Sequence, residues 1–184
     1  MNDFEKTLAR LDKFCNKKSI KYAVVGGIAV IKYGYERTTK DIDITVLCKL
    51  EEISEVHTKF IKEYLPLSED SLNFFERNFV LPVKDKITNV KIDVAAGLTV
   101  FDDTIIQRRK WTKLGEAEFY ISTLEDLIIY KLFANRYQDL ADAQILLDKN
   151  KDSIERNYLI KTIEKFREFD REDMIETLNK FLSQ

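Results

Sequence analysis

Two aspartates separated by one residue, Asp41 and Asp43, stand in the segment DIDITVLC (41–48). Acidic residues at positions 41 and 43, with apolar residues at 42, 44 and 46, predict a β-strand on which both carboxylates emerge from the same face. Two carboxylates this close repel each other, and a bound cation relieves the repulsion. Hard oxygen ligands suit Mg²⁺, which takes one or two carboxylates together with substrate phosphates. A pair that simply lies on a solvent-facing strand is the alternative interpretation.

A third carboxylate, Asp93, lies in the middle of VKIDVAAG (90–97), a second predicted strand in which its close neighbours are apolar. A charged side chain within such a strand needs a partner. If this strand pairs beside 41–48, Asp93 joins Asp41 and Asp43 and completes a clamp for two metal ions about 3.5–4 Å apart. The three aspartates are therefore a candidate metal site, provided that the two strands pair.

A glycine pair, Gly26-Gly27, lies between the apolar segment KYAVV (21–25) and IAVIKYGY (28–35), which predicts a strand followed by a short helix. Glycines allow backbone N–H groups to come close to a phosphate, and the helix N-terminus adds its positive end. A plain tight turn is the alternative interpretation of the pair.

Three polar side chains precede the first aspartate: Arg37, Thr39 and Lys40. They suit the binding of an anionic triphosphate, and they equally suit an ordinary polar loop. The combination of these residues with the glycine pair and the aspartates carries more weight than any one of them.

This combination resembles the nucleotidyltransferase superfamily with the DNA polymerase β-like fold. The resembling pattern is Gly-Gly, then Arg-x-Thr-x-Asp-x-Asp, then a later single aspartate in a strand. Within the superfamily, the chain is most similar to the minimal AbiEii-type branch, which includes bacterial toxins. Many members carry Gly-Ser where this chain has Gly26-Gly27. The resemblance covers roughly residues 20–148.

The resemblance implies an α/β (α+β) fold, in which helices flank a mixed sheet and a helical lobe follows. It also implies an enzyme that moves a nucleoside monophosphate from a nucleoside triphosphate (NTP) to a hydroxyl group. In such an enzyme Asp41, Asp43 and Asp93 are the catalytic residues and bind Mg²⁺, or Mn²⁺ in its place. The acceptor classes are an RNA 3′ end, a protein side chain or a small molecule, and one implied role is the toxin of a toxin–antitoxin pair, with an antitoxin as partner. A catalytically degenerate module that binds nucleotides or a protein partner is the alternative.

The segment TLEDLIIYKLFANRYQDLADAQILL (123–147) also resembles the AbiEii-type branch. The resemblance implies that Lys131, Arg136 and Asp139 contact the NTP. If residues 131–142 form one continuous helix, four polar residues fall within about 80° of one face, where they would line a cleft: Lys131, Asn135, Asp139 and Asp142. The alternative is an exposed helix face on which Arg136 and Asp139 form an ordinary pair, worth about 0.2–0.5 kcal/mol.

The pattern along the chain predicts an α/β core over residues 1–122 and a helical lobe over 123–184, packed as one compact unit. Within the core, Pro82 predicts that strand 78–84 is an edge or bulged strand. Leu114-Gly115-Glu116 predicts the turn of a hairpin. In the lobe, Thr123 with Asp126 predicts a helix N-cap, and the predicted helices cover four ranges: 123–136, 139–149, 153–168 and 171–182.

Composition restricts the function classes further. A formal charge of −2 argues against bulk electrostatic capture of nucleic acid. No apolar stretch approaches the ~20 residues of a membrane span, and two distant cysteines indicate free thiols in a reducing cytoplasm.

Trp111, the only tryptophan, is flanked by basic residues that suit a nucleic-acid end, but packing in the core is the more frequent role of such a residue. The only histidine, His57, lies outside the motif.

Overall fold

A computed structural model describes residues 1–183 of the 184-residue chain. Clustering of its backbone contacts divides the chain into two compact units. The first contains Met1–Ala29 and Thr38–Ser122, and the second contains Val30–Arg37 and the helical segment that begins at Thr123.

A mixed β-sheet forms the centre of the first unit, and within residues 1–183 it has seven strands in the order β3-β4-β5-β2-β1-β7-β6. Strands β2 and β5 are parallel, as are β1 and β7, whereas the other neighbouring strands are antiparallel. This sheet confirms the predicted mixed α/β fold. The strand bounds are β1 Tyr22–Val25, β2 Asp41–Leu47, β3 Tyr64–Pro66, β4 Val80–Asp85, β5 Lys91–Gly97, β6 Lys110–Leu114 and β7 Ala117–Ile121.

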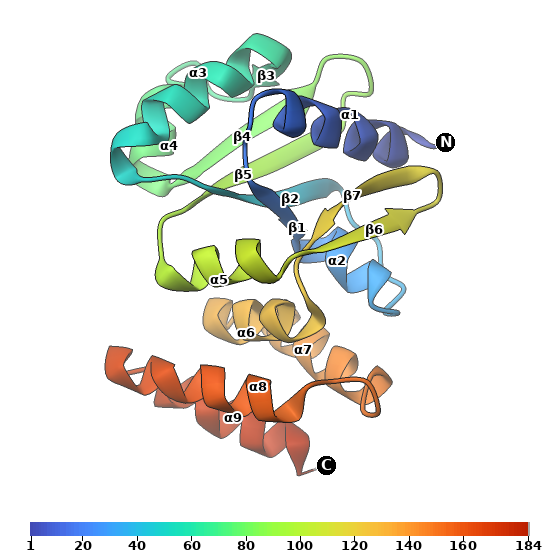
Figure 1. Cartoon of the computed structure of the whole chain (residues 1–184), viewed down its shortest axis with the longest axis vertical. Coiled ribbons are helices and arrows are strands. Elements are labelled where there is room, and N and C mark those ends of the chain that lie inside the picture. The colour runs from blue at the N-terminus through green and yellow to red at the C-terminus, as the bar shows by residue number, and fades with distance from the viewer. Residues whose placement is uncertain (184) are drawn as a thin grey trace. The chain divides into compact units, whose positions relative to one another are not determined.

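Helices cover the sheet of the first unit, with α1, α3 and α4 on one side and α5 on the other (Figure 1). The sheet face toward α1 is apolar, and Ile42, Ile44 and Ile92 on it are fully buried. Because side chains alternate along a strand, the residues between these isoleucines emerge on the opposite face. The helix bounds are α1 Asp3–Lys17, α2 Gly26–Lys32, α3 Ile53–Glu63, α4 Ser71–Asn78 and α5 Val100–Arg108.

The strand predictions hold best where a turn signal bounds them. The hairpin is confirmed, since β6 and β7 pair in antiparallel register from Leu114 opposite Ala117, and Gly115 has φ +58° in the turn.

Pro82 was predicted to lie on an edge or bulged strand. This prediction is wrong, because its strand β4 lies between β3 and β5. The short strand β3, which the sequence did not indicate, pairs with β4 from Val83 onward, so the missing N–H of Pro82 removes no bond from that ladder.

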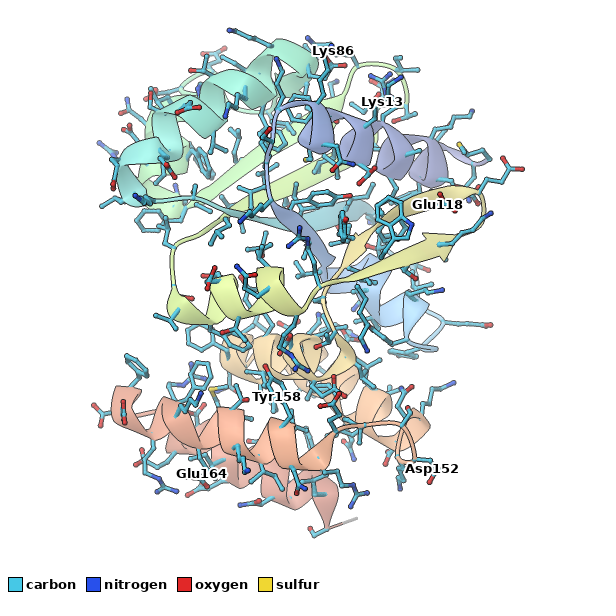
Figure 2. The ribbon with its side chains drawn as sticks, viewed as in Figure 1. Lys13, Lys86, Glu118, Asp152, Tyr158 and Glu164 are labelled. Carbon is cyan, nitrogen blue, oxygen red and sulfur yellow. The ribbon has the colours of Figure 1, made fainter. Side chains whose placement is uncertain are left out.

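Besides Val30–Arg37, the second unit contains helices α6 Leu124–Ala134, α7 Tyr137–Lys149, α8 Arg156–Glu164 and α9 Glu172–Leu182. The predicted N-cap is confirmed, since the Thr123 side chain accepts a hydrogen bond from the amide of Asp126. The Tyr158 hydroxyl, on α8, donates to the buried carboxylate of Asp126 over 2.6 Å and so joins α8 to α6 (Figure 2). None of the helices in residues 1–183 combines the length and apolar character that spanning a bilayer requires.

The separate helices predicted over 123–136 and 139–149 are confirmed, so residues 131–142 do not form one continuous helix. Helix α6 ends at Ala134, Asn135 takes the left-handed conformation with φ 52°, and α7 begins at Tyr137. A left-handed residue directly after a helix is a common way for helices to end, and asparagine tolerates it better than most residues do. Lys131 and Asp139 therefore lie on different helices and meet across them.

One buried carboxylate in the first unit provides a stability prediction. Asp85 is fully buried and accepts hydrogen bonds from Arg10 of α1 and from the amides of Ile87 and Thr88 in the β4–β5 turn. Burial by itself raises the pKa of this carboxyl, but the hydrogen bonds from Arg10 and the two amides outweigh burial and hold the pKa below its ordinary value.

We expect Asp85→Asn to reduce the free energy of unfolding by about 1–3 kcal/mol at pH 7, because the Arg10 guanidinium and the two backbone amides lose a charged acceptor. A lowered pKa in the folded state contributes stability above the unfolded pKa of about 3.9, and this contribution is lost as pH falls through the folded pKa. Urea unfolding should therefore show a deficit at pH 7 that shrinks below about pH 4. Asp103→Asn, at an exposed position of α5, is the control, and an equal deficit at both pH values would contradict the assignment.

Candidate active site

Three aspartates meet on one face of the sheet in the first unit. Parallel strands β2 and β5 align so that Asp43 lies directly opposite Asp93, and Asp41 lies opposite Lys91. Neighbouring strands are about 4.8 Å apart, and residues of equal parity share a face, so all four side chains emerge together. Asp41 and Asp93 are partly exposed, with 34% and 23% of their side chains accessible. The strand pairing on which the triad prediction depends is therefore present.

Lys91 adds a cation to these acids. Its Nζ lies 2.7 Å from Asp93 Oδ2 and 3.9 Å from Asp41 Oδ2. The hydrogen bond to Asp93, together with the neighbouring carboxylate charges, raises the pKa of Lys91 above its ordinary value. The sequence analysis did not single out Lys91, although its position two residues before Asp93 on the same strand already places both side chains on one face.

The glycine pair packs directly against the acids. Gly26 follows β1 with φ +61°, and a Cβ atom at this position would collide with the Asp43 carboxylate. The amide of Gly27 faces Asp43 Oδ2 at 3.4 Å, and a Cβ atom on Gly27 would lie 2.5 Å from Thr39 Oγ1. The absence of both side chains therefore allows Asp43 and Thr39 to approach the start of α2. A serine at position 27, as in many members of the superfamily, would require Thr39 to move.

The three polar residues before Asp41 differ in their surroundings. Thr39 Oγ1 donates to the main-chain oxygen of Asp41 over 3.1 Å, whereas Lys40 is exposed. Arg37 belongs to the second unit, where its guanidinium lies 2.5 Å from the carboxylate of Asp142. The structure thus gives Arg37 a protein carboxylate as its partner.

The other predicted NTP contacts form a second charged cluster, within the second unit. Lys131 Nζ lies 2.6 Å from Asp139 and 3.0 Å from Asp142, and all three side chains are buried. Arg136 also contacts Asp139. Burial by itself raises the pKa of Asp139, but hydrogen bonds from Arg136 and Lys131 outweigh it and hold this pKa below its ordinary value.

The comparisons with known proteins agree with this arrangement. The family model described as "Nucleotidyltransferase of unknown function (DUF6036)" matches residues 4–178. The chain belongs to this family. The superfamily expected from the glycine and aspartate pattern is therefore confirmed. No curated protein sequence matches the chain.

Solved structures with the same fold share little sequence with this family member. An antigenic nucleotidyltransferase-like protein from Paracoccidioides brasiliensis has a TM-score of 0.52 at 13% identity, covering 96% of this chain and 92% of that one. The antibiotic-resistance factor ANT(2″)-Ia has a TM-score of 0.54 at 10% identity, with coverage of 94% and 98%. The lincosamide antibiotic adenylyltransferase LnuA, bound to lincomycin, has a TM-score of 0.50 at 14% identity, with coverage of 77% and 95%. At these identities the likeness concerns the fold.

The acids of this nucleotidyltransferase-family chain have the donor chemistry for a divalent metal. Asp41, Asp43 and Asp93 offer carboxylate oxygens on one face, which is the ligand type that Mg²⁺ and Mn²⁺ prefer. As the side chains stand, however, no group of three His, Cys, Asp or Glu residues in the described part of the chain forms a ready metal site. The three aspartates have the oxygen ligands that a divalent metal needs, and the strand pairing places them on one face. In the structure Lys91 interacts with two of the three carboxylates.

Gly26 should be intolerant of a side chain. In Gly26→Ala, the new methyl group meets the Asp43 carboxylate, and a left-handed conformation costs a non-glycine residue about 1–2 kcal/mol. We expect loss of stability together with loss of nucleotide transfer, measured by urea unfolding and by incorporation of labelled NTP.

Gly34→Ala is the matched control, since Gly34 also has a positive φ, +96°, but an added Cβ would meet nothing within 4 Å. It should lose stability and keep transfer activity. Wild-type transfer by Gly26→Ala would show that the close approach to Asp43 does not matter.

Two further residues lie apart from the acids. Trp111 is 50% exposed and contacts Tyr120 edge to face, so the expectation that it packs in the core is wrong. Its strand β6 is the last in the sheet order, on the hairpin that carries Glu118 (Figure 2). His57, on α3, is buried beside Ser71 at 2.9 Å, and its burial lowers its pKa.

Proposed function

We propose that the protein transfers a nucleoside monophosphate from an NTP to a hydroxyl acceptor, with Mg²⁺ bound by Asp41, Asp43 and Asp93. One observation carries the proposal: in a chain of a nucleotidyltransferase family, β2 and β5 pair so that these three carboxylates share one face. A packing role alone would not require three acids that repel one another.

The chemistry is a substitution at phosphorus. The acceptor oxygen forms a bond to the α-phosphorus, and the bond from that phosphorus to the pyrophosphate oxygen breaks. When bound, the metal neutralises the charge that spreads over the phosphate oxygens. Asp41 and Asp43 hold the metal, and Asp93 accepts the proton of the attacking hydroxyl. The Gly26-Gly27 turn lies next to Asp43 and provides backbone amides for the triphosphate.

Roles for the other predicted residues belong to the same proposal. Thr39 and Lys40 lie just before Asp41 in the sequence, where a hydroxyl and an ammonium suit a triphosphate. Arg37, Lys131, Arg136 and Asp139 form ion pairs within the second unit, which favour a structural role in that unit over direct contact with the nucleotide.

The acceptor is a hydroxyl group on an RNA, a protein or a small molecule. The test is incubation with each α-labelled NTP and Mg²⁺, using total RNA, a protein lysate and lincomycin as separate acceptors. Lincomycin is included because LnuA, a structure with this fold, is a lincosamide adenylyltransferase bound to it. Label on one acceptor class, lost on chelation of the metal, supports the proposal, and no label under any condition contradicts it.

A catalytically degenerate, nucleotide-binding or partner-binding module is the second candidate. The observation that favours it is the ion pair between Lys91 and Asp93, which engages the proposed base. On this hypothesis the protein binds an NTP without transferring it.

A toxin role of the AbiEii type belongs to the first candidate, the active enzyme. Such a toxin would transfer label to a cellular acceptor and would lose this activity when an antitoxin binds.

A further inference from the structure

The contacts of Lys91 suggest a function that the three acids alone do not. Its ammonium group lies 2.7 Å from Asp93 and 3.9 Å from Asp41. It comes from β5 itself, directly opposite Asp41 in the ladder, so its backbone is fixed with respect to the acids. A lysine ammonium is a compact charge with three donors on a flexible stem, which can change position without any backbone movement.

The position of Lys91 between two carboxylates explains how the folded protein accommodates three neighbouring aspartates without a bound metal. Three carboxylates on adjacent strands repel one another, and one ammonium removes part of that repulsion. The lysine side chain is 40% exposed, so water screens the pair and the hold on the acids is weak. A divalent cation that reaches several carboxylates at once can displace it.

We propose that Lys91 is an internal counter-ion that occupies the acid cluster of the metal-free protein and competes with the divalent metal for Asp41 and Asp93. This inference rests on the proposed function, since it takes the three aspartates as the metal site. Metal and ammonium exclude each other because like charges at contact distance repel. Binding of the metal therefore frees Asp93 from its ion pair and releases the ammonium toward a phosphate oxygen of the NTP.

The competition is measured by titrating the protein with Mn²⁺ alone and following free Mn²⁺ by electron paramagnetic resonance. We expect Lys91→Gln to bind Mn²⁺ about tenfold more tightly than the wild type, a change of about 1.4 kcal/mol. Lys91→Arg keeps the positive charge and should stay within about twofold of the wild type. Urea unfolding of each variant verifies that it is folded before titration.

Lys84→Gln is the matched control. Lys84 lies directly opposite Lys91 on β4 and carries the same charge, but it forms no ion pair within residues 1–183. Its loss should change Mn²⁺ affinity by less than about twofold. If Lys91→Gln binds Mn²⁺ no more tightly than the wild type, or if Lys84→Gln gains as much, the counter-ion role is overturned.

Asp43→Asn separates this inference from the proposed function. Both the wild type and Lys91→Gln should lose Mn²⁺ binding when this substitution is added. If Asp43→Asn binds Mn²⁺ as tightly as the wild type, the aspartates are not the metal site and the proposed function fails. If Asp43→Asn abolishes binding but Lys91→Gln does not strengthen it, only the role of Lys91 fails.

Discussion

Asp43→Asn should reduce Mg²⁺-dependent nucleotide transfer by at least about 10²–10³-fold, the scale on which enzymes lose activity when one charge-stabilising group is removed. Asp43 lies opposite Asp93 and faces the amide of Gly27, so its carboxylate is common to the acid cluster and the glycine turn. The measurement is the initial rate of label incorporation into the acceptor at saturating Mg²⁺.

The fold of this variant should persist. Asparagine has the same shape as aspartate and removes one of three repelling charges, so the urea midpoint should equal or exceed that of the wild type. Asp103→Asn, which neutralises an exposed acid on α5, controls for the change in net charge and should retain full activity. Undiminished transfer by Asp43→Asn would refute the metal assignment.

Lys131→Met should lower the stability of the second unit by about 3 kcal/mol. The substitution leaves Asp139 and Asp142 buried without their shared ammonium, and breaking a buried ion pair costs about 3–5 kcal/mol. The lower end of this range applies because Arg136 and Arg37 still contact the two carboxylates. Methionine keeps the length of the side chain and its apolar packing.

The two units can be followed separately in one urea titration. Trp111, the only tryptophan, lies in the first unit, so its fluorescence reports on that unit. Far-ultraviolet circular dichroism follows the helices of both units, so a change in it without a change in fluorescence belongs to the second unit. The pKa of Asp139 is held low in the folded state, so its contribution is present above the ordinary aspartate pKa and fades as pH falls. The deficit of Lys131→Met should therefore shrink in acid.

Lys161→Met, at an exposed position of α8, is the matched control and should change stability by less than about 0.5 kcal/mol. A circular dichroism transition of Lys131→Met at the wild-type urea concentration would mean that the cluster contributes no net stability.

The local sequence determined the elements that present the acids. Alternation in DIDITVLC and VKIDVAAG fixes which side chains share a face of each strand, because a strand has a period of two. Thr123 and Gly115 mark the start of a helix and a hairpin turn for equally local reasons, a side-chain cap and a positive φ. These predictions needed no knowledge of distant residues.

Only the tertiary structure shows which residues that are distant in the sequence lie together at the site. The register that sets Asp43 opposite Asp93 joins strands 50 positions apart, and spacing along the chain cannot specify it. The sequence predicts a break between the helices over 123–136 and 139–149, but the contact of Lys131 with Asp139 depends on how the two helices pack after the left-handed Asn135. Glycines at 26 and 27 were predicted to serve a phosphate, and the structure shows what they also allow, the close approach of Asp43 and Thr39. Local propensity follows from neighbouring residues, whereas a site requires side chains from separate strands and helices to arrive at one place.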